Sequence, residues 1–254
     1  MSLIAKLFGR SGAARHDVKR LVIMMPWGRV GSNLLSSLIK GSFDSGTVRF
    51  ANEPLYQMRD KAKQEAWFRG FYQPEANERL IGSKHALRAL EDRDATARLF
   101  EELELPVLRM RRDNIVKVAI SQERAKLYAR RSERETGKAM WGVRKGEDPL
   151  PPTPLDAEEF VDTLALVAAE DKALAAFRPD CPLFDLDYET LVASEGKTLA
   201  AIFDWIGIAP DRAPQERFVK ATPDDLAKAV PNIAELRNAA AKAGLERLDP
   251  MFDG

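Results

Sequence analysis

A loop near the start of the chain, PWGRVGSN, has the residue types that bind an anion. Gly28 and Gly31 allow the backbone to turn tightly around a ligand. Arg29 supplies a positive charge, and Ser32 and Asn33 can donate hydrogen bonds to the ligand. An apolar segment precedes the loop and a helical pattern follows it, so unpaired N–H groups at the helix start add to the site. These features predict a site for a phosphate group.

The loop differs from the P-loop of nucleoside triphosphatases. That motif, G-x-x-x-x-G-K-[ST], places a lysine on the β- and γ-phosphates and a hydroxyl on magnesium. The lysine and the hydroxyl are missing here, because Ser32 and Asn33 follow Gly31 directly. Ordinary hydrolysis of ATP or GTP is therefore disfavoured. The remaining alternatives are a phosphate of another kind and a plain glycine turn in which Ser32 and Asn33 only cap a helix.

A second basic region lies between Arg109 and Arg131, where eight arginines and lysines occur with only two acidic residues. A solvated helix face would explain this excess. Alternatively, Arg112 lies where a strand turns into a helix, and Ser121 lies nine positions further along that helix. Both can then reach the carboxyl edge of a parallel sheet, where such sheets bind ligands. Arg111 is an equal alternative to Arg112.

Hydrophobic periodicity predicts the elements that position these residues. Short apolar runs rich in β-branched residues alternate with longer stretches of helical period. This pattern is typical of a three-layer, P-loop-like α/β fold with a central, mostly parallel sheet of about five strands flanked by helices. The predicted strands are 21–25, 47–51, 80–82, 106–110 and 183–186. The predicted helices are 32–40, 54–68, 86–103, 114–131, 156–177, 196–206 and 232–243.

Composition limits the classes of protein that fit the chain. Its 254 residues suit an extension over 1–19 and a single domain over 20–254, with the proline-rich stretch 144–156 as a loop or lid. The 39 basic and 39 acidic residues cancel, which gives no support for nucleic-acid binding. One cysteine and two histidines are too few for a metal site rich in these residues. Without an apolar run of membrane-spanning length or a signal peptide, we expect a cytoplasmic protein whose N-terminus at most touches a membrane.

The two basic segments together resemble the nucleotide-binding motifs of sulfotransferases that use 3′-phosphoadenosine 5′-phosphosulfate. MPWGRVGSNLL resembles the 5′-phosphosulfate loop of that family, and RRDNIVKVAIS resembles its 3′-phosphate segment. YETL, TPDDL and NIAEL follow in the order of bacterial glycan and lipopolysaccharide members. The resemblance implies nucleotide-binding roles for Arg29, Val30, Gly31, Ser32, Asn33, Arg112, Ser121, Lys220 and Thr222.

Sulfuryl transfer requires a base near the acceptor and cations near the bridging oxygen, where negative charge develops. Arg29 can supply such a cation. Glu53 follows the second predicted strand and is the first choice of base, because family members that act on carbohydrates commonly carry a glutamate in such an E-P-L segment. Alternatively, Glu53 only caps a helix that begins at Pro54. His85 is the rival base, although a lone histidine is more often structural, and the resemblance places Lys84 or its neighbour toward the site.

The resemblance implies an enzyme, a sulfotransferase that transfers a sulfuryl group from 3′-phosphoadenosine 5′-phosphosulfate to an acceptor hydroxyl without a metal. The expected acceptor is a carbohydrate or glycolipid, and Trp67 and Trp141 could stack on a sugar or pack against the core. Two alternatives stay open: a P-loop-type small-molecule kinase, and a nucleotide-binding scaffold without activity. The sequence leaves the oligomeric state open.

Overall fold

One parallel β-sheet forms the centre of the molecule. The computed structural model describes residues 17–139, 141, 150–214 and 225–253. The sheet has five strands in the order β2-β3-β1-β4-β5, and every neighbouring pair is parallel. The strands are β1 (Lys19–Met25), β2 (Val48–Asn52), β3 (Leu80–Ala86), β4 (Val107–Arg111) and β5 (Leu183–Asp187). The predicted fold class is confirmed.

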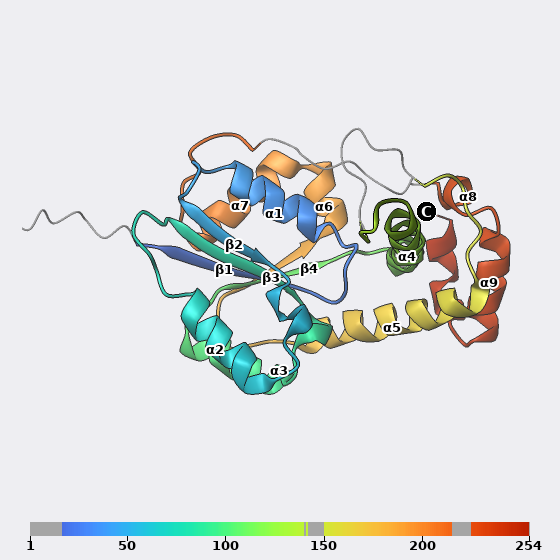
Figure 1. Ribbon diagram of the computed structural model, residues 1–254, viewed down its shortest axis with the longest axis horizontal. Helices are drawn as coiled ribbons and strands as arrows, with labels where there is room; N and C mark the ends of the chain where they lie inside the picture. Colours follow the sequence, from blue (N-terminus) through green and yellow to red (C-terminus); the bar gives the residue numbers. More distant parts are fainter. Residues whose placement is uncertain (1–16, 140, 142–149, 215–224, 254) are drawn as a thin grey trace, which may run out of the picture.

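Helices cover both faces of the sheet (Figure 1). One face carries α1 (Ser32–Gly41), α6 (Tyr188–Ala193) and α7 (Glu195–Ile206). The other face carries α2 (Lys61–Phe71) and α3 (Arg93–Glu102). Because side chains of a strand alternate between faces, β1 contributes Ile23 and Met25 to one buried apolar cluster and Val22 and Met24 to the other. The layers on both sides of the sheet are therefore held by hydrophobic burial.

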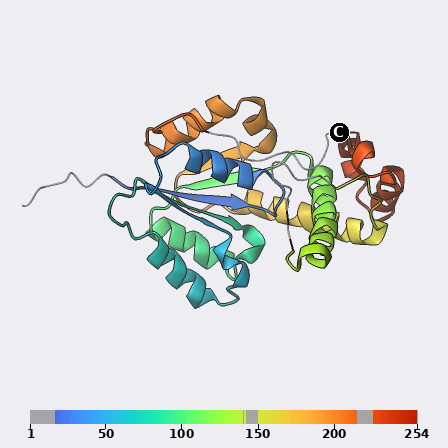
Figure 2. The same cartoon turned by 45° about the horizontal axis from the view of Figure 1, so that its top comes forward.

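A further group of helices lies beyond the carboxyl ends of the strands (Figure 2). α4 (Ile115–Thr136) packs along α5 (Ala157–Ala176), and α9 (Ile233–Lys242) packs against α5. Three 3₁₀ segments and one short helix complete the described elements: η1 (Pro54–Gln57), η2 (Leu87–Ala89), η3 (Glu246–Phe252) and α8 (Leu226–Ala229). The helices α4, α5 and α9 thus border the carboxyl edge of the sheet, where the loop after β1 lies (Figure 2).

Two predicted helices are wrong in their extent. The stretch 54–68 divides into η1 and α2, because the Asp60 side chain accepts a backbone hydrogen bond at 2.8 Å and starts a new helix. The stretch 86–103 contains the end of β3, then η2, and then α3, which Asp92 caps in the same way at 2.8 Å. Both caps are aspartates inside segments that read as continuous helices by periodicity alone.

The strand order creates a topological switch point between β1 and β4 at the carboxyl edge of the sheet. The chain leaves β1 toward β2 on one side and leaves β4 toward β5 on the other. In open α/β sheets, ligands bind where the connections that leave two neighbouring strands run in opposite directions. The loop after β1 and the turn after β4 flank this switch point, and the ends of β3 and β2 lie on the far side of β1.

Several expectations concern parts of the chain outside the described residues. They include residues 1–16 of the predicted extension and residues 144–149 of the predicted loop or lid. Residues 150–156 contain neither helix nor strand, and the division into extension, domain and lid stays a prediction. Among the described residues, no helix has the length and apolar character needed to cross a membrane. In the same ranges, no group of three or more His, Cys, Asp or Glu residues could hold a metal ion.

Candidate active site

The loop between β1 and α1 turns through two residues with left-handed backbone conformation. Arg29 has a φ of 70° and Gly31 a φ of 83°. Glycine is needed at the second position because other residues are strained at such a φ, and because a Cβ there would lie 2.4 Å from the Tyr188 ring. Helix α1 begins directly afterwards, at Ser32. The predicted phosphate loop is thus a closely packed turn that leads straight into a helix.

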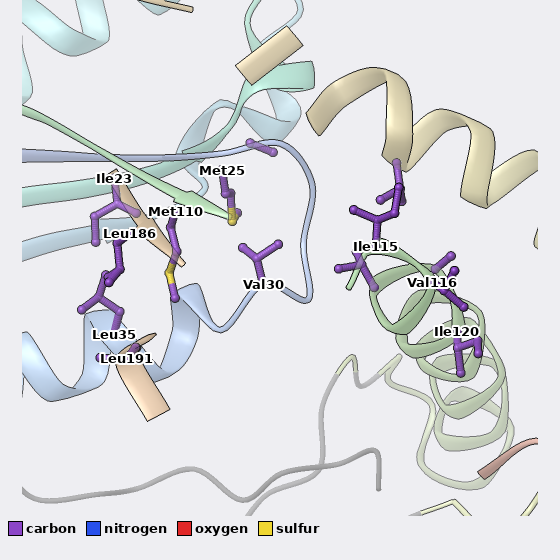
Figure 3. Close-up of a cluster of buried hydrophobic side chains, with 14 of the residues drawn as sticks. Ile23, Met25, Val30, Leu35, Met110, Ile115, Val116, Ile120, Leu186 and Leu191 are labelled. Atoms are coloured by element: carbon purple, nitrogen blue, oxygen red, sulfur yellow. The ribbon is translucent and has the colours of Figure 1, made fainter. Parts of the chain in front are cut away.

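The N-terminus of α1 suits an anion. Within the described residues no side chain caps this end, and its first turn holds no acidic residue, so unpaired N–H groups and the helix dipole favour a negative charge. The Ser32 hydroxyl donates to Met25 Sδ at 2.9 Å. Val30 is 1% exposed, and Figure 3 shows its side chain pointing toward Met25. Ser32 and Val30 therefore offer a ligand their backbone rather than their side chains.

Three predicted phosphate-binding residues contact one another at the switch point between β1 and β4. Arg29 Nε donates to Ser121 Oγ on α4 at 3.0 Å, and Arg112 Nη1 donates to the Arg29 carbonyl at 3.5 Å. Arg29 also donates to the Trp141 carbonyl at 2.8 Å, and among the described residues it has no carboxylate partner. Burial, and then the charge of Arg112, lower the pKa of Arg29 below its usual value. This corner of the site carries an excess of positive charge.

The two adjacent arginines at the end of β4 have different partners. Arg111 forms two hydrogen bonds with Asp171 of α5, at 2.8 and 2.5 Å, and this pairing raises its pKa. The Arg112 guanidinium lies 4.7 Å from the centre of the Tyr188 ring and 3.6 Å from Glu189. Of the two, Arg112 is the one that contacts the phosphate loop, which favours it as the phosphate ligand.

A second cluster surrounds Lys84, on the other side of the phosphate loop. The Lys84 ammonium lies 3.1 Å from the Glu53 carboxylate. It also lies 3.4 Å from Ser32 Oγ and donates a hydrogen bond to Asn33 Oδ1. Burial lowers the pKa of Lys84, and the neighbouring Glu53 charge opposes this shift. The Lys84 side chain is 1% exposed and that of Glu53 34%, so a buried cation connects the phosphate loop to an accessible carboxylate.

Glu53 follows the last residue of β2 and has a left-handed backbone, with a φ of 53°. Its N–H donates to the Lys84 carbonyl at 2.9 Å, which fixes it against β3. It precedes η1, but its side chain makes no capping hydrogen bond there. The alternative that Glu53 only caps a helix is therefore not supported. Strained backbone at a non-glycine residue is a feature that clusters at functional sites.

His85 lies on the opposite face of the sheet from Lys84, because neighbouring strand residues alternate. It is 0% exposed, and its ring packs 5.4 Å from that of Trp67. Its Nε2 lies 2.7 Å from Ser83 Oγ, which lies 2.6 Å from the Tyr72 hydroxyl. The predicted catalytic role of His85 is corrected on this ground, since a core residue does not reach an acceptor. Of the two roles open to Trp67, core packing is the one observed.

The burial of His85 predicts a loss of stability in acid. Burial, and then the Lys84 charge, lower the pKa of His85 to about 3, whereas an unfolded chain has a histidine pKa of about 6.5. Between these values only the unfolded state binds the proton, so the free energy of unfolding decreases as the pH falls. From pH 7 to pH 5 it should fall by about 2 kcal/mol more in the wild type than in His85→Gln. Urea denaturation at both pH values measures this, and equal losses in the two proteins would contradict a buried neutral histidine.

Two residues have a larger part in the site than the sequence predicts. Lys84 lies at the centre of one cluster, and the Tyr188 ring packs against the phosphate loop and beside the Arg112 guanidinium. In the sequence, Lys84 lies in the segment GSKH and Tyr188 in the segment YETL. Both segments resemble sulfotransferase motifs, but neither specifies these contacts. Lys220 and Thr222 lie outside the described residues, so their roles stay predictions.

Three sulfotransferases are among the solved structures similar to this chain, whereas no protein-family model and no curated protein matches it. A sulfotransferase from Alicyclobacillus acidocaldarius is 16% identical over 91% of this chain and 95% of its own, with a TM-score of 0.44. Mouse sulfotransferase SULT7A1 complexed with PAP is 12% identical over 77% of this chain and 60% of its own, with a TM-score of 0.44. The sulfotransferase domain from the curacin biosynthetic pathway is 12% identical over 77% and 76%, with a TM-score of 0.40. At these identities and TM-scores the similarity assigns neither a family nor a function to this chain.

Proposed function

We propose that the chain is a sulfotransferase whose donor is 3′-phosphoadenosine 5′-phosphosulfate. The observation that carries the proposal is the contact of Arg29 with Ser121 and Arg112, beside the N-terminus of α1, which no described side chain caps. Backbone N–H groups and guanidinium groups thus form two neighbouring positions for anions. A nucleotide with one phosphate at its 5′ end and another on its 3′ oxygen suits two such positions better than a linear triphosphate does.

The proposed donor lies with its 5′-phosphosulfate at the start of α1 and its 3′-phosphate at Arg112 and Ser121. The loop backbone of residues 30–33 would bind the first group, and Lys220 and Thr222 would close over the nucleotide. The sulfuryl group then faces Lys84, on the β3 side of the loop. The separation of the two clusters by the phosphate loop supports this orientation, because a donor held at its centre reaches both.

In the proposed reaction, Glu53 accepts the proton of the acceptor hydroxyl as the hydroxyl oxygen attacks sulfur. The bond from sulfur to the bridging oxygen breaks in line, and its electron pair stays on the 5′-phosphate of the released adenosine 3′,5′-bisphosphate. Lys84 and Arg29 stabilise the charge that develops on this oxygen. Because Lys84 is buried, its charge acts in a medium of low dielectric and is weakly screened.

The acceptor in this proposal is a carbohydrate or glycolipid hydroxyl. Partial exposure of the Glu53 side chain supports access from solvent. Trp141 is 55% exposed, and its carbonyl is held by Arg29, so its ring is available to a sugar beside the donor. The expected cytoplasmic location, the N-terminal membrane contact, and the absence of a metal and of nucleic-acid partners stay predictions.

Thermal unfolding with and without nucleotides tests the proposed donor. Adenosine 3′,5′-bisphosphate at about 100 times its Kd, without magnesium, should stabilise the fold by about 2.7 kcal/mol, which raises Tm by about 5–10 °C. ATP with magnesium should raise it much less. The reverse order would favour the small-molecule kinase and contradict the proposal. Stabilisation by the bisphosphate without transfer of labelled sulfate to any acceptor would favour the inactive scaffold.

A further inference from the structure

An arginine outside the two clusters lies over two aromatic rings at the same edge of the sheet. Arg88 lies in η2, two residues after β3 ends at Ala86. Its guanidinium carbon lies 3.8 Å from the centre of the Trp27 ring, in the phosphate loop, and 5.9 Å from that of Tyr56, in η1. Stacking uses the faces of the planar guanidinium. Its N–H donors, which point outward in the plane, stay available to a ligand.

Arg88 brings an unmatched positive charge to this edge. The structure gives its side chain neither an ion pair nor a hydrogen bond within the described residues, and its guanidinium lies over the two rings. The neighbouring Lys84, by contrast, is paired with Glu53 at 3.1 Å. Arg93, five residues further along the chain, is paired with Glu170 at 2.8 Å. An arginine positioned by rings but left without an acidic partner is suited to an anionic ligand.

One buried side chain joins the segments that carry these residues. Gln64 of α2 is 3% exposed and donates to the carbonyls of Met58 and Ala89, at 2.7 and 2.8 Å. Met58 follows η1 and Ala89 ends η2, so this amide fixes the two segments relative to each other. The Tyr56 N–H donates to the Glu53 carbonyl at 3.3 Å. The position of the cluster relative to the candidate base is therefore preorganised.

From this geometry we infer that Arg88 binds an anionic group of the acceptor while the acceptor hydroxyl lies at Glu53. The inference rests on the proposed function and narrows its acceptor class to hydroxyl compounds that also carry a negative charge, with sugar acids as the example that fits best. Tyr56, which is 49% exposed, supports a sugar, because aromatic rings pack well against its apolar face. A guanidinium that only packed on the two rings would give no preference for a charged acceptor.

Paired glycosides test the inference. Methyl β-glucuronide and methyl β-glucoside differ in one carboxylate, as do the corresponding galacturonide and galactoside. Each is titrated into protein saturated with adenosine 3′,5′-bisphosphate, and again without nucleotide, with tryptophan fluorescence as readout. In at least one pair the acid should bind at least about fivefold more tightly. Arg88→Met should remove this preference and Arg88→Lys should keep part of it, while Arg98→Met, an exposed arginine on α3, should keep all of it.

The possible results distinguish an acceptor-binding role of Arg88 from a donor-binding role and from simple packing. Equal affinities within both pairs, or a preference that persists in Arg88→Met, would overturn the inference. A loss of bisphosphate affinity in Arg88→Met as large as in Arg112→Met would also overturn it, because Arg88 would then belong to the donor site. If the protein did not bind the bisphosphate but showed a carboxylate preference that depends on Arg88, the inferred role of Arg88 would be supported. The proposed donor would then be contradicted.

Discussion

Replacing Glu53 with glutamine should lower kcat for sulfuryl transfer by about 10²- to 10⁴-fold. The substitution keeps the size of the side chain and its position beside Lys84 and removes its ability to accept a proton. Affinity for adenosine 3′,5′-bisphosphate should be retained, because in the proposed orientation Glu53 lies on the acceptor side of Lys84. Initial rates with labelled donor, measured together with a calorimetric Kd, separate the two effects.

Glu91 offers a matched control for this substitution. Its side chain is 33% exposed and lies 3.5 Å from Arg59, whereas that of Glu53 is 34% exposed and lies 3.1 Å from Lys84. Glu91→Gln should therefore show the effect on the rate of removing a comparable charge at a position distant from the candidate base. It should keep the wild-type rate. If Glu53→Gln also kept that rate, Glu53 would not be the base, and His85 is buried too deeply to replace it.

Replacing Arg112 with methionine should weaken binding of adenosine 3′,5′-bisphosphate by about 10- to 150-fold, the usual range for losing hydrogen bonds to a charged group. Arg112 contacts the phosphate loop at Arg29, and its removal leaves the 3′-phosphate with fewer cations. The same loss should not occur for adenosine 5′-monophosphate, which has no 3′-phosphate. Calorimetric titration of both nucleotides gives the two Kd values.

Arg111→Met is the control for this loss. Arg111 is adjacent in sequence, but its guanidinium is held by Asp171 at 2.8 and 2.5 Å. The substitution should lower Tm through the lost ion pair and leave the bisphosphate Kd close to that of the wild type. A larger loss of affinity in Arg111→Met than in Arg112→Met would exchange the roles of the two residues.

The strands and the phosphate loop could be predicted from the sequence because each depends on a local pattern. A strand buried on both faces of a parallel sheet is an apolar run wherever it occurs, and β1 is such a run from Leu21 to Met25. Gly31 meets a local requirement of the same kind, since its φ of 83° favours glycine. These short-range signals placed the loop correctly at the carboxyl edge of the sheet.

The roles of Lys84 and His85 could not be predicted because they depend on where β3 ends. A strand ending at residue 82 would leave both residues in a loop, where either could face the site. The strand continues to Ala86, so the two side chains point to opposite faces. One residue reaches the phosphate loop and its neighbour is buried under α2.

The choice between Arg111 and Arg112 depends on a contact that is distant in sequence. Asp171 lies on α5, 60 positions after Arg111, and only the packing of α5 beside the sheet brings it to the end of β4. Helical periodicity predicts that α5 exists but says nothing of which sheet residues it meets. For the same reason the ring contacts of Arg88 have no signature in the sequence.

The most direct test of the proposed site is whether one nucleotide uses both anion positions. Calorimetry without magnesium compares adenosine 3′,5′-bisphosphate with adenosine 5′-monophosphate, in the wild type and in Arg112→Met. We expect the wild type to bind the bisphosphate at least about tenfold more tightly than the monophosphate, and Arg112→Met to bind the two with nearly equal affinity. Equal affinity for the two nucleotides in the wild type would contradict a 3′-phosphate position at Arg112 and Ser121, and with it the proposed donor.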